Sequence, residues 1–191
     1  MASAPLYPDE NGINRPANGV FLVDPATGAA LASGGFTVSA SQTRPADTTA
    51  YAANDVVGSD TAAGGAVWSF ANIASAGGDV LIDSVELEID VNAIPSGQTS
   101  YNLYLYGVTP PSALGDNAAF DLAVGDRASF LGKISLGAPV DEGSTLYVSV
   151  EGVNKHVKLT GTGLFAYLTT VGGFTPSASS VRKVTLHGFK V

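Results

Sequence analysis

The stretch SVELEIDV, residues 84–91, alternates strictly between polar and apolar side chains. Val85, Leu87, Ile89 and Val91 occupy one set of positions, and serine, glutamate and aspartate occupy the other. In an extended chain successive side chains point to opposite faces, so this alternation places one face on a core and the other in water. The stretch therefore predicts a half-buried β-strand.

Similar segments follow one another along most of the chain, separated by clusters of glycine, proline, asparagine and aspartate. We predict further strands within residues 66–73, 100–108, 129–136, 145–153, 156–161, 164–171 and 181–191. The pattern allows one short helix, in which Asp116 would cap residues 117–123. This succession of short strands and turns favours an all-β fold, a two-sheet antiparallel β-sandwich of jelly-roll-like type.

Residues 100–108 differ from the other predicted strands because both of their faces are apolar or aromatic. One face holds a tyrosine and two leucines, and the other holds Tyr104, Tyr106 and Val108. Such a strand lies centrally between two layers or is covered by another chain. Tyr104 and Tyr106 are therefore candidate interface residues.

The composition is that of a globular protein. The chain has 191 residues, of which 45% are hydrophobic and 14% are charged. No apolar run approaches the roughly 20 residues that span a bilayer, so we expect no membrane association. Residues 1–5 lack the basic start of a secretory signal peptide. The absence of cysteine excludes disulfides and thiolate metal sites.

The charge is distributed unevenly along the chain, whose formal net charge is −8. Residues 1–150 hold 16 acidic and 4 basic residues, whereas residues 151–191 hold 1 acidic and 5 basic residues. An acidic body argues against nucleic acid as a partner, because that affinity comes largely from lysine and arginine. We expect the basic C-terminal strands to pair with acidic strands of the same fold or of a neighbour.

Residues 1–35 form a separate, turn-rich region in which VFLV, residues 20–23, is a single short apolar stretch. This region has too little apolar surface to fold alone. We predict an extended N-terminal arm over residues 1–35, which docks on the body or on a neighbouring subunit, and a single β-sandwich domain over residues 36–191. A frayed terminus is the alternative. The candidate contact residues of the arm are Leu6, Tyr7, Phe21, Leu22 and Val23.

The motifs give no catalytic residue, cofactor or metal site. GTGLFA, residues 161–166, matches a dinucleotide fingerprint, but β-favouring residues follow it, so we interpret it as a turn between strands. His156 is expected on a solvated face, and the face of His187 is ambiguous. Neither belongs to a hydrolase elbow or a zinc motif. The recurring aspartates 116, 121 and 126 are explained by a helix cap and solvated turns.

The aromatic residues offer a sugar-binding alternative. Trp68, Tyr104 and Tyr106 could form a flat platform, because aromatic rings stack on the apolar faces of sugars and jelly rolls are common lectin scaffolds. Core packing of Trp68 and an interface role for the tyrosines explain the same residues. We favour burial over sugar binding.

The stretch TRPADTTAYAANDVVG, residues 43–58, is rich in side-chain oxygens, which we assign to turns and strand ends. Together with DVLIDSVELEID, LYLYGVTPP, LGDNAAFDLAVGDRASFLGKISL and the closing LFAYLTTVGGFTPSASSVRKVTLHGFKV, it resembles a family of small virion structural proteins of tailed bacteriophages. The resemblance extends over residues 43–191. Within this family, the chain is similar in particular to head decoration, or cement, proteins.

The resemblance implies a non-enzymatic β-sandwich that assembles, often as a homotrimer, on the outer capsid surface. Its partner would be the major capsid protein, and its location the virion after synthesis in the cytoplasm of the host bacterium. A tail or baseplate component remains an alternative, as does a carbohydrate-binding or receptor-binding module. A small hydrolase would depend on His156 or His187.

Overall fold

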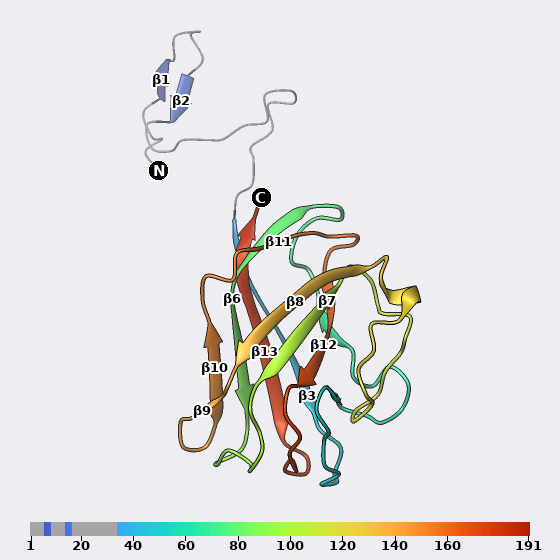
Figure 1. Ribbon diagram of the computed structural model, residues 1–191. Helices are drawn as coiled ribbons and strands as arrows, with labels where there is room; N and C mark the ends of the chain where they lie inside the picture. The colour runs from blue at the N-terminus through green and yellow to red at the C-terminus, as the bar shows by residue number, and fades with distance from the viewer. Residues whose placement is uncertain (1–5, 9–13, 17–33) are drawn as a thin grey trace. The chain divides into compact units, whose positions relative to one another are not determined.

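The computed structural model describes residues 6–8, 14–16 and 34–191, and the chain divides into two units, Met1–Ser33 and Gly34–Val191. In the first unit, β1 (Leu6–Pro8) pairs antiparallel with β2 (Asn14–Pro16). The second unit, called the body below, contains two antiparallel sheets (Figure 1).

The first sheet of the body has the strand order β3-β13-β6-β10-β9, and β11 also pairs with β6. Its strands are β3 (Gly35–Thr43), β13 (Val181–Lys190), β6 (Asp79–Ile89), β10 (Leu146–Val150), β9 (Val140–Asp141) and β11 (Lys155–Lys158). The second sheet has the order β4-β12-β7-β8, and β5 also pairs with β12. Its strands are β4 (Val56–Val57), β12 (Leu164–Thr170), β7 (Tyr101–Tyr106), β8 (Phe130–Gly137) and β5 (Trp68–Phe70).

The strand order is that of a jelly roll. Strands β4 and β5 share one position because both pair with β12, and β10 and β11 share another because both pair with β6. With the short edge strand β9 left aside, the strands of the body occupy eight positions along the chain. The first pairs with the last, the second with the seventh, the third with the sixth and the fourth with the fifth. This nested pairing across two sheets confirms the predicted β-sandwich and its jelly-roll character.

The core between the sheets is built by the alternation that the sequence shows. Val85, Leu87 and Ile89 are buried, whereas the glutamates between them are partly exposed. Trp68 is fully buried, and its indole N–H donates a hydrogen bond of 3.1 Å to the carbonyl of Val57. This burial confirms core packing of Trp68 and removes it from any exposed sugar platform.

A second apolar cluster covers the outer face of the β7–β12 sheet. Tyr106 and Tyr167 are fully buried there, and Tyr104 packs on Phe120 with 4.0 Å between ring centroids. Phe120 belongs to the long connection between β7 and β8. The chain therefore covers β7 on both sides, which explains why both faces of this strand are apolar.

The predicted helix over residues 117–123 is wrong. The carboxylate of Asp116 accepts hydrogen bonds from the Tyr51 hydroxyl (2.6 Å) and the Gly58 N–H (2.8 Å), so it does not cap a helix. Asn117 has a φ of 63°, which is incompatible with a right-handed helix. In the described part of the chain, helical structure is limited to the 3-10 turn η1 (Val124–Asp126). Among these residues there is also no helix with the length and apolar character needed to cross a bilayer.

Candidate functional site

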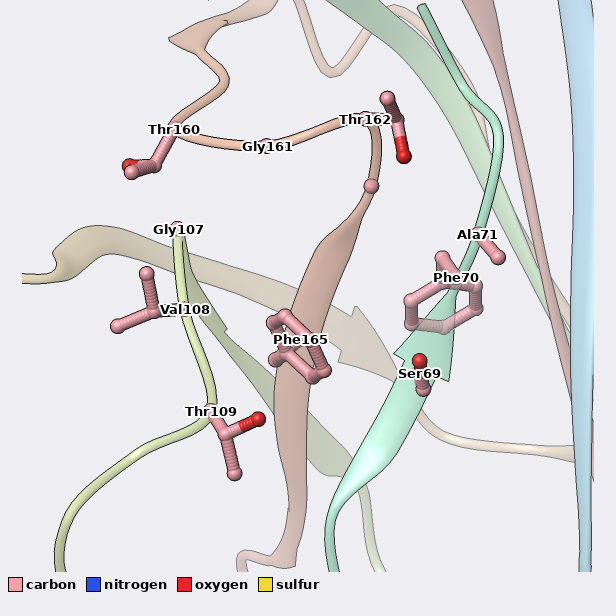
Figure 2. Close-up of a pocket in the computed structure, with 11 residues that line it drawn as sticks. Ser69, Phe70, Ala71, Gly107, Val108, Thr109, Thr160, Gly161, Thr162 and Phe165 are labelled. Atoms are coloured by element: carbon pink, nitrogen blue, oxygen red, sulfur yellow. The ribbon is translucent and has the colours of Figure 1, made fainter. Parts of the chain in front are cut away.

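A pocket of about 420 Å³ opens on the body where three segments meet. Its walls are residues 69–71 at the end of β5, residues 107–109 after β7, and the turn of residues 160–163 between β11 and β12. Figure 2 shows the ring of Phe165, from β12, in the middle of these segments. The volume is within the range of small-molecule sites, roughly 300–1,000 Å³.

Glycines allow the walls of the pocket to approach one another. A Cβ added to Gly163 would overlap the carbonyl of Phe70, and one added to Gly107 would lie 2.7 Å from the hydroxyl oxygen of Thr160. A Cβ added to Gly161 would meet no atom within 4 Å. The segment GTG is thus a turn between strands, as predicted, and one of its glycines leaves the pocket open.

The aromatic ring in this pocket is held by its strand. Leu164 and Ala166, on either side of Phe165, are fully buried between the sheets. Alternation along β12 therefore directs Phe165 to the opposite, outer face, where it is half-buried. Its neighbours in the pairing register are Tyr106 on β7 and Ser69 on β5.

A buried polar network lies in other loops of the body. The Arg44 side chain has no exposed surface and donates hydrogen bonds to the hydroxyl of Tyr51 (3.0 Å) and the carbonyl of Thr49 (3.0 Å). It also contacts the carboxylates of Asp47 (3.0 Å) and Asp116 (3.8 Å). Burial, together with the neighbouring Asp116 carboxylate, raises the pKa of Tyr51 above its usual value. Because the Arg44 side chain at its centre is fully buried, this network supports the fold.

The outer face of the first sheet carries a ladder of opposite charges. Lys183 on β13 pairs with Glu88 on β6 at 3.0 Å, and Lys158 on β11 pairs with Asp79 on β6 at 3.2 Å. His156 is largely exposed beside the same Asp79, which confirms its predicted solvated face. The basic C-terminal strands therefore pair with acidic strands of their own fold, one of the two predicted possibilities.

The second histidine belongs to an array that has the residue types of a hydrolase triad. His187 Nδ1 lies 3.1 Å from the Thr37 hydroxyl, and its Nε2 lies 3.5 Å from a carboxylate oxygen of Glu86. All three residues are on neighbouring strands β3, β13 and β6. Backbone N–H groups of paired strands lie in the plane of the sheet, so none points above this face to stabilise an oxyanion. The array therefore favours cross-strand bonding over catalysis.

Two of the three regularly spaced aspartates are buried, although the sequence predicted a helix cap at Asp116 and a solvated turn at Asp126. Asp116 is 4% exposed and Asp126 is fully buried, where it accepts a hydrogen bond of 3.0 Å from the Ser112 N–H. Asp121 is exposed. Among the described residues, no three His, Cys, Asp or Glu side chains come together in a way that could hold a metal ion.

The predicted contact residues have different positions. Tyr106 is fully buried by its own chain, and Tyr104 is half-buried, so only Tyr104 presents side-chain surface. Leu6 and Tyr7 belong to β1, and Phe21, Leu22 and Val23 lie outside the described residues. Contacts of these residues with a neighbour therefore remain predictions. The sequence did not indicate the pocket around Phe165, although alternation with the apolar Leu164 and Ala166 predicts the outward position of this ring.

No protein-family model and no curated protein matches the chain. A chain of the Ralstonia phage GP4 capsid is similar in structure, with 13% identity, a TM-score of 0.38, and coverage of 90% of this chain and 90% of that one. A chain of the cyanophage Pam1 capsid has 14% identity, a TM-score of 0.34, and coverage of 92% and 99%. A chain of the Israeli acute paralysis virus particle has 13% identity, a TM-score of 0.30, and coverage of 100% and 94%. The three come from viral capsids, and the similarities are too low to place this chain in a family.

Proposed function

We propose that this chain is a non-enzymatic structural protein of a tailed-phage virion, and specifically a head decoration protein. In this role it binds the major capsid protein on the outer capsid surface and bridges neighbouring capsid subunits. The observation that carries the proposal is the jelly-roll strand order, an architecture that viral capsid domains use. The sequence resemblance over residues 43–191 supports a phage structural protein of the head decoration type.

The mechanism is mechanical. Packaged DNA presses on the capsid shell, and a protein that bridges several subunits adds interface free energy that opposes rupture. A protein that binds only the expanded lattice also stabilises that lattice by mass action, because it shifts the equilibrium toward the state it binds. A body held by two sheets and a continuous core suits this role, because it transmits load without rearranging.

A direct test mixes the purified full-length protein with expanded, undecorated capsids of the phage that encodes it and images the particles. We expect ordered density on the outer lattice and little density on unexpanded capsids. Isolated tails serve as the comparison, because binding there with none on capsids would establish the tail or baseplate alternative. Protein that stays in the supernatant in every mixture would refute a virion role.

The N-terminal arm is proposed to reach a neighbouring subunit through Leu6, Tyr7 and the stretch Phe21–Leu22–Val23. Because the body begins with β3 at Gly35, removal of residues 1–33 leaves every strand of the body present. We expect this truncation to weaken capsid binding and to reduce the oligomer size measured by analytical ultracentrifugation. The full-length oligomer is expected to be a trimer.

A sharper test keeps the arm at full length and introduces a single charge into it. Leu22→Asp introduces a carboxylate into the apolar stretch, and Ala17→Asp adds the same charge in the turn-rich segment before it. We expect Leu22→Asp to reproduce the effect of the truncation and Ala17→Asp to behave as the unmodified protein. If both variants and the truncated chain bind capsids as tightly as the unmodified protein does, the arm makes no contact with the capsid.

A further inference from the structure

The pocket around Phe165 has a lining that the proposed virion role does not use. Hydroxyl groups surround the aromatic ring: Figure 2 shows Thr109 on one side, Ser69 on another, and Thr162 on the turn above. The side chains of these three residues are exposed. Within the described part of the chain, none of their hydroxyl groups makes a side-chain hydrogen bond to protein. Each is therefore available both to donate and to accept.

The electrostatic character of the pocket restricts its ligand. Its lining consists of serine, threonine, glycine, alanine, valine and phenylalanine, with no charged side chain among them. A phosphate or carboxylate would meet no cation there, and the net charge of −8 disfavours anions further. A multivalent cation would meet no carboxylate. The ligand that this lining suits is neutral and rich in hydroxyl groups.

An aromatic ring and a rim of hydroxyl groups are complementary to the two kinds of surface that a pyranose presents. The C–H face of the sugar is apolar and stacks on an aromatic ring, as Phe165 offers. The hydroxyl groups at the edge of the sugar are donors and acceptors, as are those of Ser69, Thr109 and Thr162. We propose that this pocket binds the ring of a neutral sugar. The proposal concerns a second activity and does not depend on where the protein is located.

This pocket differs from the platform of Trp68, Tyr104 and Tyr106 that the sequence suggested for sugar binding. Trp68 and Tyr106 are buried, whereas Phe165 is half-buried at the centre of an open pocket. The missing side chain at Gly161 keeps one wall open, so a ring can enter beside the turn. We expect binding by one stacked ring and a few exposed hydroxyl groups to be weak, with a dissociation constant on the order of millimolar.

Saturation-transfer NMR on the full chain tests the proposal, with the methyl glycosides of glucose, galactose, mannose and N-acetylglucosamine as probes. At least one of them should receive saturation, most strongly at the ring protons of its apolar face. Glucuronic acid is the anionic comparator and should receive markedly less. Absence of transfer to all four glycosides, or equal transfer to glucuronic acid, would overturn the proposal.

Variants locate the binding. Phe165→Ala removes the stacking surface and should weaken binding about tenfold. Because this change also affects packing, the double variant Thr109→Val and Thr162→Val removes two hydroxyl groups at nearly constant volume and should also weaken binding about tenfold. Tyr147→Ala is the matched control, since Tyr147 is a half-buried aromatic residue on β10, away from the pocket. Unchanged binding by the threonine double variant and by Phe165→Ala would place the sugar elsewhere and refute the assignment.

Discussion

At the scale of single residues, Arg44 connects loops that are distant in sequence. Its guanidinium group contacts Asp47, Thr49 and Tyr51 in the loop after β3, and Asp116 in the connection between β7 and β8. A buried charge is stable only when hydrogen-bonded partners surround it. Here the Thr49 N–H and the Arg44 guanidinium hold the pKa of Asp47 below its usual range.

Replacing Arg44 by alanine should reduce the free energy of unfolding by about 3–5 kcal/mol, because Asp116 remains buried without its cation. Arg127→Ala is the control, since Arg127 is exposed, and should change stability by no more than about 0.5 kcal/mol. Urea denaturation followed by tryptophan fluorescence measures both, with the buried Trp68 as the probe. Equal midpoints for the two variants would show that the network contributes nothing to stability.

The sequence predicted that the oxygen-rich stretch 43–58 serves local structure, and the hydrogen bonds around Arg44 and Asp47 agree with this. It could not show that Arg44 is the centre of this stretch. An arginine before a proline is typical of an exposed turn, and its burial here depends on Asp116, which only the fold brings near. Other long-range contacts of Asp116 made the helix prediction wrong, because its carboxylate accepts hydrogen bonds from Tyr51 and Gly58 and does not cap a helix.

At the scale of elements, β6 is kept in register by an irregularity. Its inward residues are Val80 and Ile82, then Val85 and those that follow, so the alternation shifts by one position at residues 83–84. The pairing with β13 shifts at the same level, between His187 and Gly188. A bulge of this kind adds one residue to one strand and lets both ends of it face the core.

Gly188→Ala should destabilise the body by about 3 kcal/mol, because the new Cβ would overlap the carbonyl oxygen of Leu81 and lie 2.8 Å from the Phe36 ring. Gly125→Ala is the matched control, since a Cβ there meets nothing within 4 Å. Thermal unfolding by circular dichroism measures both. A melting temperature for Gly188→Ala close to that of the control would show that β6 and β13 can move apart to admit the Cβ with little loss of stability.

The connection between β7 and β8 also shapes the body, because it covers the outer face of β7. Phe120 packs on Tyr104 and lies near Tyr167, with 6.3 Å between the ring centroids of the latter pair. The sequence showed that both faces of this strand needed cover. Which part of the chain supplies it was not visible, because residues 107–129 have no periodic pattern.

Phe120→Ala should reduce stability by about 2 kcal/mol and increase hydrogen exchange across residues 107–129, because it removes the contact that fixes this connection on the sheet. Phe189→Ala provides the comparison, since Phe189 is 51% exposed and should have a small effect. Hydrogen exchange followed by mass spectrometry separates the two. Unchanged exchange in Phe120→Ala would mean that other contacts hold the connection in place.

At the scale of the whole molecule, the body buries the side chains of several tyrosines. Burial raises the pKa of Tyr101 to about 12, although the neighbouring Arg182 offsets part of this effect. Burial also raises the pKa of Tyr51 and Tyr106. A phenol that binds its proton more tightly when folded stabilises the protein below the pKa of the unfolded chain, about 10. That stability is lost as the pH rises through the folded pKa.

We therefore expect the free energy of unfolding to fall between about pH 10 and pH 12, by up to about 1.4 kcal/mol per pH unit for each buried tyrosine. Tyr101→Phe removes one of these phenols and should have a shallower decline. Urea midpoints across this range measure the slope, with the same variants at neutral pH as reference. Parallel declines for the variant and the unmodified chain would contradict a contribution from Tyr101.

The sequence by itself determined the fold class, the approximate strands and the burial of most of their apolar residues. These follow from periodicity, which is local and can be seen within eight or nine residues, as in β6. It missed β3, a strand of glycine, serine, threonine and alanine with few large apolar side chains, and the two-residue β9. Such strands are stabilised mainly by pairing with a neighbour, so their own residues indicate little.

Only the tertiary structure decided the order of the strands, the burial of Arg44 and Asp116, and the pocket around Phe165. Each depends on segments that are far apart in the chain, such as β3 beside β13, or the turn after β11 beside the end of β5. Alternation determines which side of a strand is apolar, but it carries no information about which strand pairs with it. That choice is made by the total packing and hydrogen bonding of the whole body.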